Sequence, residues 1–141
     1  KVDDLVTFYI APLSGQFLIK LDTWIDRHAK TNKDAYDMFY LADNFYLTNI
    51  TDKFPPPQEV IDSDDPNFDM FLAGMQWIAA ELREILTDEH RMYYANYIHE
   101  ELKLGDKSEL LRDMIEVATG RVEDTSAIIT GFEHFEKIIS L

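Results

Sequence analysis

Apolar residues recur at three- and four-residue steps through most of this chain, a spacing that favours helices over strands. Such steps place side chains on one face of an α-helix, whereas a half-buried β-strand would need strict alternation. The first segment with this period contains Phe17, Leu18, Leu21, Trp24 and Ile25. In all, the period marks residues 14–28, 35–46, 67–86, 87–104, 106–119 and 124–141. Residues 2–10 fit either a short strand or a helix, so we predict an all-α chain of six or seven helices.

An irregular segment at residues 49–69 interrupts the helical pattern. Its three successive prolines, residues 55–57, cannot continue a helix and favour an extended backbone. The part before this segment is too small to build its own core, and 141 residues suit one domain. We therefore predict a single helical domain over residues 1–141. It is an irregular bundle with one long loop, rich in proline and aspartate, at about residues 49–66.

Residues typical of helix ends flank several of the predicted helices. Thr87 can accept a hydrogen bond from a first-turn N–H, and either Asp65 or Asn67 could do so for the third helix. Gly105 suits the position after a helix C-terminus. Gly131 lies inside a predicted helix, where glycine costs about 1 kcal/mol relative to alanine. We therefore expect a close helix crossing at Gly131.

The charge balance restricts the partners that this chain can bind. Aspartate and glutamate total 27 against 13 lysines and arginines, which gives a formal net charge of −14. Such a field repels nucleic-acid phosphates and anionic lipids, and it attracts basic surfaces. We therefore expect a protein partner with a basic surface, with no direct binding of nucleic acid and no binding to a membrane.

The absence of cysteine removes several kinds of chemistry. Disulfides, thiolate catalysis, thiolate zinc sites and iron–sulfur clusters are all excluded. No apolar run approaches the ~18 residues that a membrane-spanning helix needs. The first ten residues also lack the pattern of a signal peptide. Together these observations predict a cytoplasmic protein.

The stretch TDEHRMYYANYIHEEL, at residues 87–102, concentrates phenolic and ionisable side chains. On a helical wheel Ala95 and Ile98 share one side, whereas Tyr93 and Tyr97 lie on nearly the opposite side. A helix with two apolar faces is either sandwiched between layers or exposes one of those faces. The sequence leaves both arrangements open.

An exposed tyrosine face rimmed by carboxylates would suit a protein interface. Tyrosine provides a large contact area at a low cost in conformational entropy, and an acidic rim attracts a basic partner. The predicted partner-binding residues are Tyr93, Tyr97, His90, Glu100 and Glu101 of this helix, with Asp62, Asp64 and Asp65 of the loop.

Neither a metal ion nor a cofactor is expected from the residue pattern. None of the four histidines has a glutamate three residues before it or a histidine four residues after it, so helical ligand pairs are missing. The loop beginning at Asp62 also departs from the calcium-loop pattern. That pattern needs an oxygen ligand, a glycine and a glutamate where this chain has Pro66, Asn67 and Ala73.

Arg83 and His90 form the one spacing that suggests catalysis. They enclose the six residues EILTDE, which resembles the Arg-x(4–6)-His signature of HEPN-type RNases. The resemblance implies that Arg83 would stabilise a phosphate and that His90 would act as general acid or base. It covers this short motif alone, and Glu84 stands where the family favours a small polar residue.

The sequence therefore favours a non-enzymatic, acidic interaction module, such as an inhibitor, an immunity-type protein or a nucleic-acid mimic. A small RNase that uses Arg83 and His90 is one alternative. A small-ligand sensor is another, because helices rich in phenylalanine, methionine and tyrosine can enclose an apolar pocket.

Overall fold

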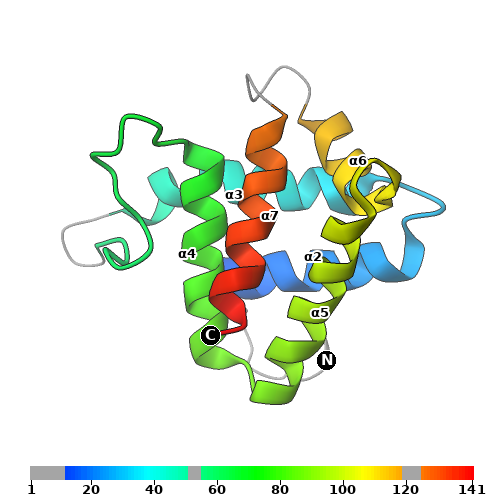
Figure 1. Ribbon diagram of the computed structural model, residues 1–141, viewed down its shortest axis with the longest axis horizontal. Coiled ribbons are helices and arrows are strands. Elements are labelled where there is room, and N and C mark those ends of the chain that lie inside the picture. The colour runs from blue at the N-terminus through cyan, green and yellow to red at the C-terminus, as the bar shows by residue number, and fades with distance from the viewer. Residues whose placement is uncertain (1–11, 51–54, 119–124) are drawn as a thin grey trace.

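The computed structural model describes residues 12–50, 55–118 and 125–141, and every regular element within them is helical (Figure 1). In chain order the elements are α2 (Leu13–Arg27), α3 (Lys33–Asn49), α4 (Met70–Ile85), α5 (Asp88–Leu104), the 3-10 turn η1 (Gly105–Lys107), α6 (Glu109–Val117) and α7 (Ser126–Ile139). The predicted all-α bundle is thus confirmed. The interpretation of residues 2–10 lies outside the described residues. Across the described ranges, no helix combines the length and apolarity needed to cross a membrane.

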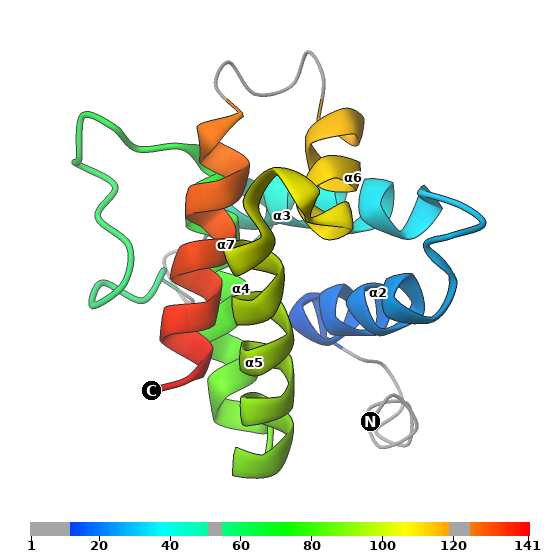
Figure 2. The same ribbon diagram turned by 45° about the vertical axis from the view of Figure 1, so that its right-hand side comes forward.

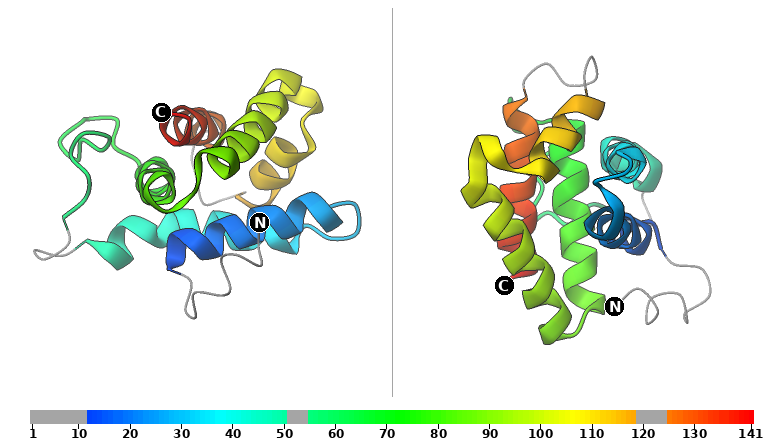
Figure 3. Two further views of the ribbon diagram at one scale, coloured as in Figure 1. Left: turned by 90° about the horizontal axis from the view of Figure 1, so that it is seen from below. Right: turned by 90° about the vertical axis from the view of Figure 1, so that its right-hand side faces the viewer.

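The helices form two layers, which are separated most clearly in Figure 3. Helices α2 and α3 are antiparallel neighbours in one layer. Helices α4, α7 and α5 lie side by side in the other layer and run across the first pair. The short helix α6 lies at one end of the bundle, beside α3 and the end of α5 (Figure 2). The apolar faces of both layers meet in one continuous core.

The two layers come closest where α3 crosses α4. Phe39 and Phe71 stack there with ring centroids 5.4 Å apart. Gly74 makes this approach possible, because a Cβ atom at this position would lie 1.9 Å from the backbone oxygen of Ala42. No side chain fits at that distance, so glycine is needed for packing rather than for backbone conformation.

Gly131 marks a second close crossing, between α7 and α4, as the sequence predicts. A Cβ atom at Gly131 would lie 2.7 Å from Cε2 of Phe71. The predicted ends of α5 are also confirmed. The Thr87 hydroxyl accepts a hydrogen bond from the backbone N–H of His90 at 3.2 Å, and Gly105 follows the last turn with a φ of 56°.

The predicted N-cap of the third helix is wrong, because neither Asp65 nor Asn67 caps α4. Asp69 does so, and its Oδ1 accepts a hydrogen bond from the backbone N–H of Leu72 at 2.9 Å. The Asp65 carboxylate instead accepts from the backbone N–H of Asn67 at 2.8 Å, which stabilises a turn within the loop. The helix itself begins at Met70, three residues after the predicted start.

The loop between α3 and α4 is anchored to the core by two apolar side chains. Ile61 is 2% exposed, and Phe68 packs edge-on against Tyr46 with ring centroids 5.1 Å apart. The described part of the loop is therefore fastened to the bundle, with its aspartates on the outside.

Candidate functional site

Helix α5 lies at the edge of its layer (Figure 1), so one of its two apolar faces is packed inward and the other faces outward. Its inner face buries Tyr94, Ala95 and Ile98. On the outer side, the Tyr93 side chain is 52% exposed, and its ring meets Tyr94 edge-on at 4.9 Å. Tyr97 lies between these extremes, partly buried against the core. The helix is therefore not sandwiched: Tyr93 is half-exposed on its outer side, and Tyr97 is partly buried.

Two carboxylates of helix α2 lie near Tyr94, next to the exposed tyrosine. The Tyr94 hydroxyl donates a hydrogen bond to Oδ1 of Asp22 at 3.1 Å. Burial, followed by the charge of Asp22, raises the pKa of Tyr94 above its usual value, and Asp26 adds to the shift. Asp22 and Asp26 are four residues apart and therefore share one side of α2. They place two negative charges near Tyr94, the buried neighbour of Tyr93.

Helix α6 adds a further carboxylate from another direction. Burial raises the pKa of Tyr97 to about 12, and the charges of Glu101, Tyr93 and Glu109 contribute in the same direction. Glu109 stands in the first turn of α6, with its side chain 52% exposed. Three helices thus converge on one acidic, phenolic area.

We call this area the acidic tyrosine surface. It consists of Asp22 and Asp26 of α2, Tyr93, Tyr97 and Glu100 of α5, and Glu109 of α6. Glu100 belongs to it because it lies two helical turns after Tyr93 and is exposed on the same side of α5.

Glu100 and Glu101, although adjacent, have different roles. Glu100 approaches Lys103 at 3.6 Å, and both side chains are well exposed, so this contact is weak. Glu101 accepts hydrogen bonds from the Ser108 hydroxyl at 2.8 Å and from the backbone N–H of Leu110 at 3.3 Å. Its carboxylate therefore fastens the start of α6 to α5. His90 lies in the first turn of α5 and is partly buried.

The predicted loop residues Asp62, Asp64 and Asp65 lie elsewhere on the molecule. Figures 1 and 3 show their loop and α5 on opposite sides of the α4–α7 pair. Oδ1 of Asp62 accepts a hydrogen bond from the backbone N–H of Asp64 at 3.0 Å, which forms a local turn. The eight predicted residues therefore do not form one surface.

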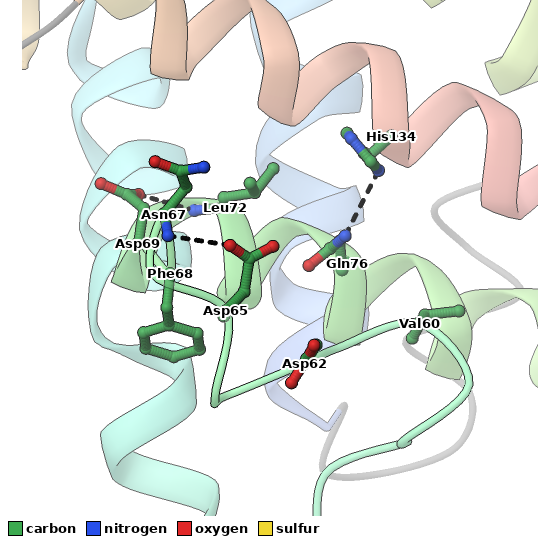
Figure 4. Close-up of a pocket in the computed structure, with 10 residues that line it drawn as sticks. Val60, Asp62, Asp65, Asn67, Phe68, Asp69, Leu72, Gln76 and His134 are labelled. Carbon is green, nitrogen blue, oxygen red and sulfur yellow. Dashed lines mark hydrogen bonds between the residues drawn. The ribbon is translucent and has the colours of Figure 1, made fainter.

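The loop does enclose a small cavity of about 220 Å³ against α4 and α7 (Figure 4). Asp62, Asp65 and Asp69 line it, opposite a hydrogen-bonded pair in which Gln76 Nε2 lies 3.2 Å from Nδ1 of His134. Among the described residues, no three histidine, aspartate or glutamate side chains are close enough together to hold a metal ion.

A second hollow, which the sequence analysis did not identify, lies between α2 and α3. Its volume is about 410 Å³, and its lining includes Tyr36, Tyr40, Lys20 and Asp37. The two tyrosine rings stack 6.4 Å apart, and Lys20 Nζ lies 2.9 Å from Asp37 Oδ2. The two tyrosines occur four residues apart, off the buried stripe of α3, and this spacing was the available signal.

Arg83 belongs to the last turn of α4, and His90 belongs to the first turn of α5. Arg83 lies near the end of α4, with its Nε 3.9 Å from Oε1 of Glu84. It lines a shallow pocket that also includes Pro55 and Pro57 of the loop, and His90 is not among the lining residues.

Comparison of the chain with protein-family models, with curated proteins and with solved structures finds no significant match.

Proposed function

We propose that the protein is a non-enzymatic interaction module that binds a basic protein surface through the acidic tyrosine surface. One observation carries the proposal: the half-exposed Tyr93 adjoins Tyr94 and Tyr97, and carboxylates from three helices, α2, α5 and α6, act on those two neighbours. An inhibitor, an immunity-type protein or a mimic of nucleic acid would use such a surface.

The physical basis is an aromatic anchor surrounded by charge. Tyrosine side chains are enriched among interface residues whose truncation costs about 2 kcal/mol or more. Tyr93 is exposed enough to enter a partner, while its edge-on contact with the buried Tyr94 limits its conformational freedom. Little side-chain entropy is therefore lost when it binds.

The charge of the surface selects the class of partner. Asp22, Asp26, Glu100 and Glu109 provide negative charge around the phenols, on a protein whose formal net charge is already −14. At an ionic strength of about 0.15 M, charges act over about 8 Å. Lysine- and arginine-rich surfaces are therefore attracted, and nucleic-acid phosphates are repelled. The cysteine-free composition is compatible with a reducing compartment such as the cytoplasm.

The experiment compares two variants that change composition identically at different places. The test variant carries Tyr93→Ala and Asp26→Lys, and the control carries Tyr36→Ala and Asp64→Lys. Tyr36 is 50% exposed and Tyr93 is 52% exposed, and the net charge of each variant rises by two, because one aspartate becomes a lysine. Immobilised wild-type protein is expected to retain basic proteins from a lysate at low salt and to release them at about 0.5 M salt, where screening extends only a few ångströms.

For a retained and purified partner, the test variant should bind at least about tenfold more weakly, as expected for loss of an anchor. The control should stay within about threefold of wild type, because it changes only long-range attraction. Equal losses in the two variants would show that net charge alone drives retention. Unchanged binding of the test variant would place the interface elsewhere.

A further inference from the structure

His28 connects the C-terminus of α2 to α6 in an arrangement that depends on its protons. The imidazole stacks on the indole of Trp24 with ring centroids 4.1 Å apart and an interplanar angle of 18°. Its Nδ1 lies 3.0 Å from the Trp24 carbonyl oxygen, and its Nε2 lies 3.0 Å from Oε2 of Glu109. Both ring nitrogens therefore have partners.

Both partners accept hydrogen bonds and cannot donate them. A carbonyl oxygen has only lone pairs to offer, and so does an ionised carboxylate. A neutral imidazole carries one N–H, so it could satisfy the Trp24 carbonyl or Glu109 but not both. Only the doubly protonated imidazolium of His28 makes the two hydrogen bonds at once.

Other charged groups around His28 come from α2, α3 and α6. On α6, Arg112 lies 3.7 Å from Oε1 of Glu109, and Asp113 accepts the indole N–H of Trp24 at 3.0 Å. On α2, Arg27 pairs with Asp34 of α3 at 2.7 Å. The nearest carboxylate that His28 contacts is thus Glu109.

The buried face of α6 limits what this contact can control. Leu110, Leu111 and Met114 are at most 4% exposed, so they hold the helix in the bundle whatever the charge of His28. Glu109 is the first residue of α6 and also belongs to the acidic tyrosine surface. A change at His28 therefore acts on the first turn of α6 and on that edge of the surface.

We propose that His28 is a proton-dependent clasp between α2 and the first turn of α6. Protonated, it compensates the charge of Glu109. When the proton is lost, Glu109 keeps only the longer, exposed contact with Arg112 at 3.7 Å, so its negative charge at the edge of the acidic tyrosine surface is less compensated.

The direction of the pH dependence follows from the contacts of His28. Partial burial lowers the pKa of His28, but the hydrogen bonds to Glu109 and to the Trp24 carbonyl raise it, and the net value lies above the usual 6.5. Stabilisation by the clasp is fully present below pH 6.5, while Glu109 stays ionised, and it is lost as the pH rises through the folded-state pKa.

The test uses the free protein. Titration of the histidine ring protons by NMR, with His28 assigned from the signal lost in His28→Gln, should give a pKa above 6.5 that falls in Glu109→Gln. Hydrogen exchange of the Leu111 and Arg112 amides, corrected for intrinsic rates, should accelerate about three- to tenfold between pH 6 and pH 8.5. In His28→Gln this pH dependence should disappear.

His99→Gln is the matched control, because His99 also pairs with a carboxylate, that of Glu136 at 3.1 Å, but joins α5 to α7. It should leave the exchange profile of α6 unchanged. The clasp is overturned if His28 titrates at or below 6.5, if Glu109→Gln leaves its pKa unchanged, or if wild type and His28→Gln show the same exchange profile.

A consequence for binding rests on the proposed function. A basic partner should bind about two- to fivefold more tightly above the His28 titration than below it, in wild type but not in His28→Gln. If the NMR and exchange results agree with the clasp but no basic partner binds at the acidic tyrosine surface, the proposed function alone is refuted. A bound partner with no pH difference between wild type and His28→Gln would refute the coupling alone.

Discussion

Replacing Gly74 by alanine should destabilise the protein, because the new methyl group meets backbone. The added Cβ would lie 1.9 Å from the carbonyl oxygen of Ala42, whereas non-bonded carbon and oxygen atoms approach to about 3.3 Å. No rotamer change can relieve this contact, so the two atoms must separate by about 1.4 Å, which moves α3 and α4 apart. A gap of only about 0.5–1 Å already removes a quarter to a half of the dispersion energy of the atoms that face it.

The size of the effect follows from two opposing contributions. Overpacking costs about 1–3 kcal/mol, and the upper end applies here because both sides of the contact are backbone. Alanine regains about 1 kcal/mol of helix propensity over glycine. The net loss is about 2 kcal/mol, out of a typical total of about 5–15 kcal/mol. At roughly 3 °C per kcal/mol for a chain of this size, Tm should fall by about 6 °C.

Gly131→Ala provides the matched control within the same bundle. Its Cβ would meet side-chain atoms of Phe71 at 2.7 Å and of Met75 at 3.2 Å, and side chains yield more readily than the backbone that Gly74 faces. The gain in helix propensity should then offset most of the cost, for a net change within about 1 kcal/mol. Urea unfolding at pH 7, followed by circular dichroism, measures both variants. If Gly131→Ala proves as damaging as Gly74→Ala, or if Gly74→Ala matches wild type, this account of the crossing is refuted.

Three further substitutions test contacts that the bundle depends on. The hydrogen bonds from Arg27 hold the pKa of the buried Asp34 below its usual 3.8. In urea titrations, Asp34→Asn should therefore have a lower free energy of unfolding than wild type at pH 7, and this difference should disappear as the pH falls below 3.8. Tyr94→Phe keeps the ring but loses the hydrogen bond to Asp22, so its free energy of unfolding should fall by about 1.5 kcal/mol, and an unchanged value would deny that bond. Ser108→Ala removes the N-cap of α6 and should cost about 1 kcal/mol, with faster amide exchange confined to that helix; a global acceleration would contradict a local cap.

The number and type of the helices could be predicted because they depend on local information. Three- and four-residue spacing decides which face of each helix is apolar, and it does so without knowledge of the neighbours. Thr87 and Gly105 end α5 as expected, since a cap acts only within its own turn. The predicted cap of α4, Asp65 or Asn67, is wrong because Asp69 can also accept a nearby N–H, and only the course of the loop decides which residue does so at the helix start.

The candidate site could be predicted only in part. Tyr93 and Glu100 stood out because one helix presents them on the same side. Glu101 carries the same charge as its neighbour, but its carboxylate accepts a hydrogen bond from the Ser108 hydroxyl. That contact depends on how the chain folds back after Gly105. The acidic loop at Asp64 looked equivalent in the sequence, but the α4–α7 pair separates it from α5 (Figure 1).

The amino-acid sequence alone determined the all-α class, the negative charge and the presence of two apolar faces on α5, since each follows from residue type and short-range spacing. It left open whether the second face of α5 is exposed, which the tertiary structure decided. Only the tertiary structure decided that Asp22 contacts Tyr94 and that His28 contacts Glu109. The sequence separations of these two pairs are 72 and 81 residues. Such pairs depend on how the two layers cross. That crossing is set by the close approach of backbones at Gly74 and by the packing of the whole core, which no local pattern encodes.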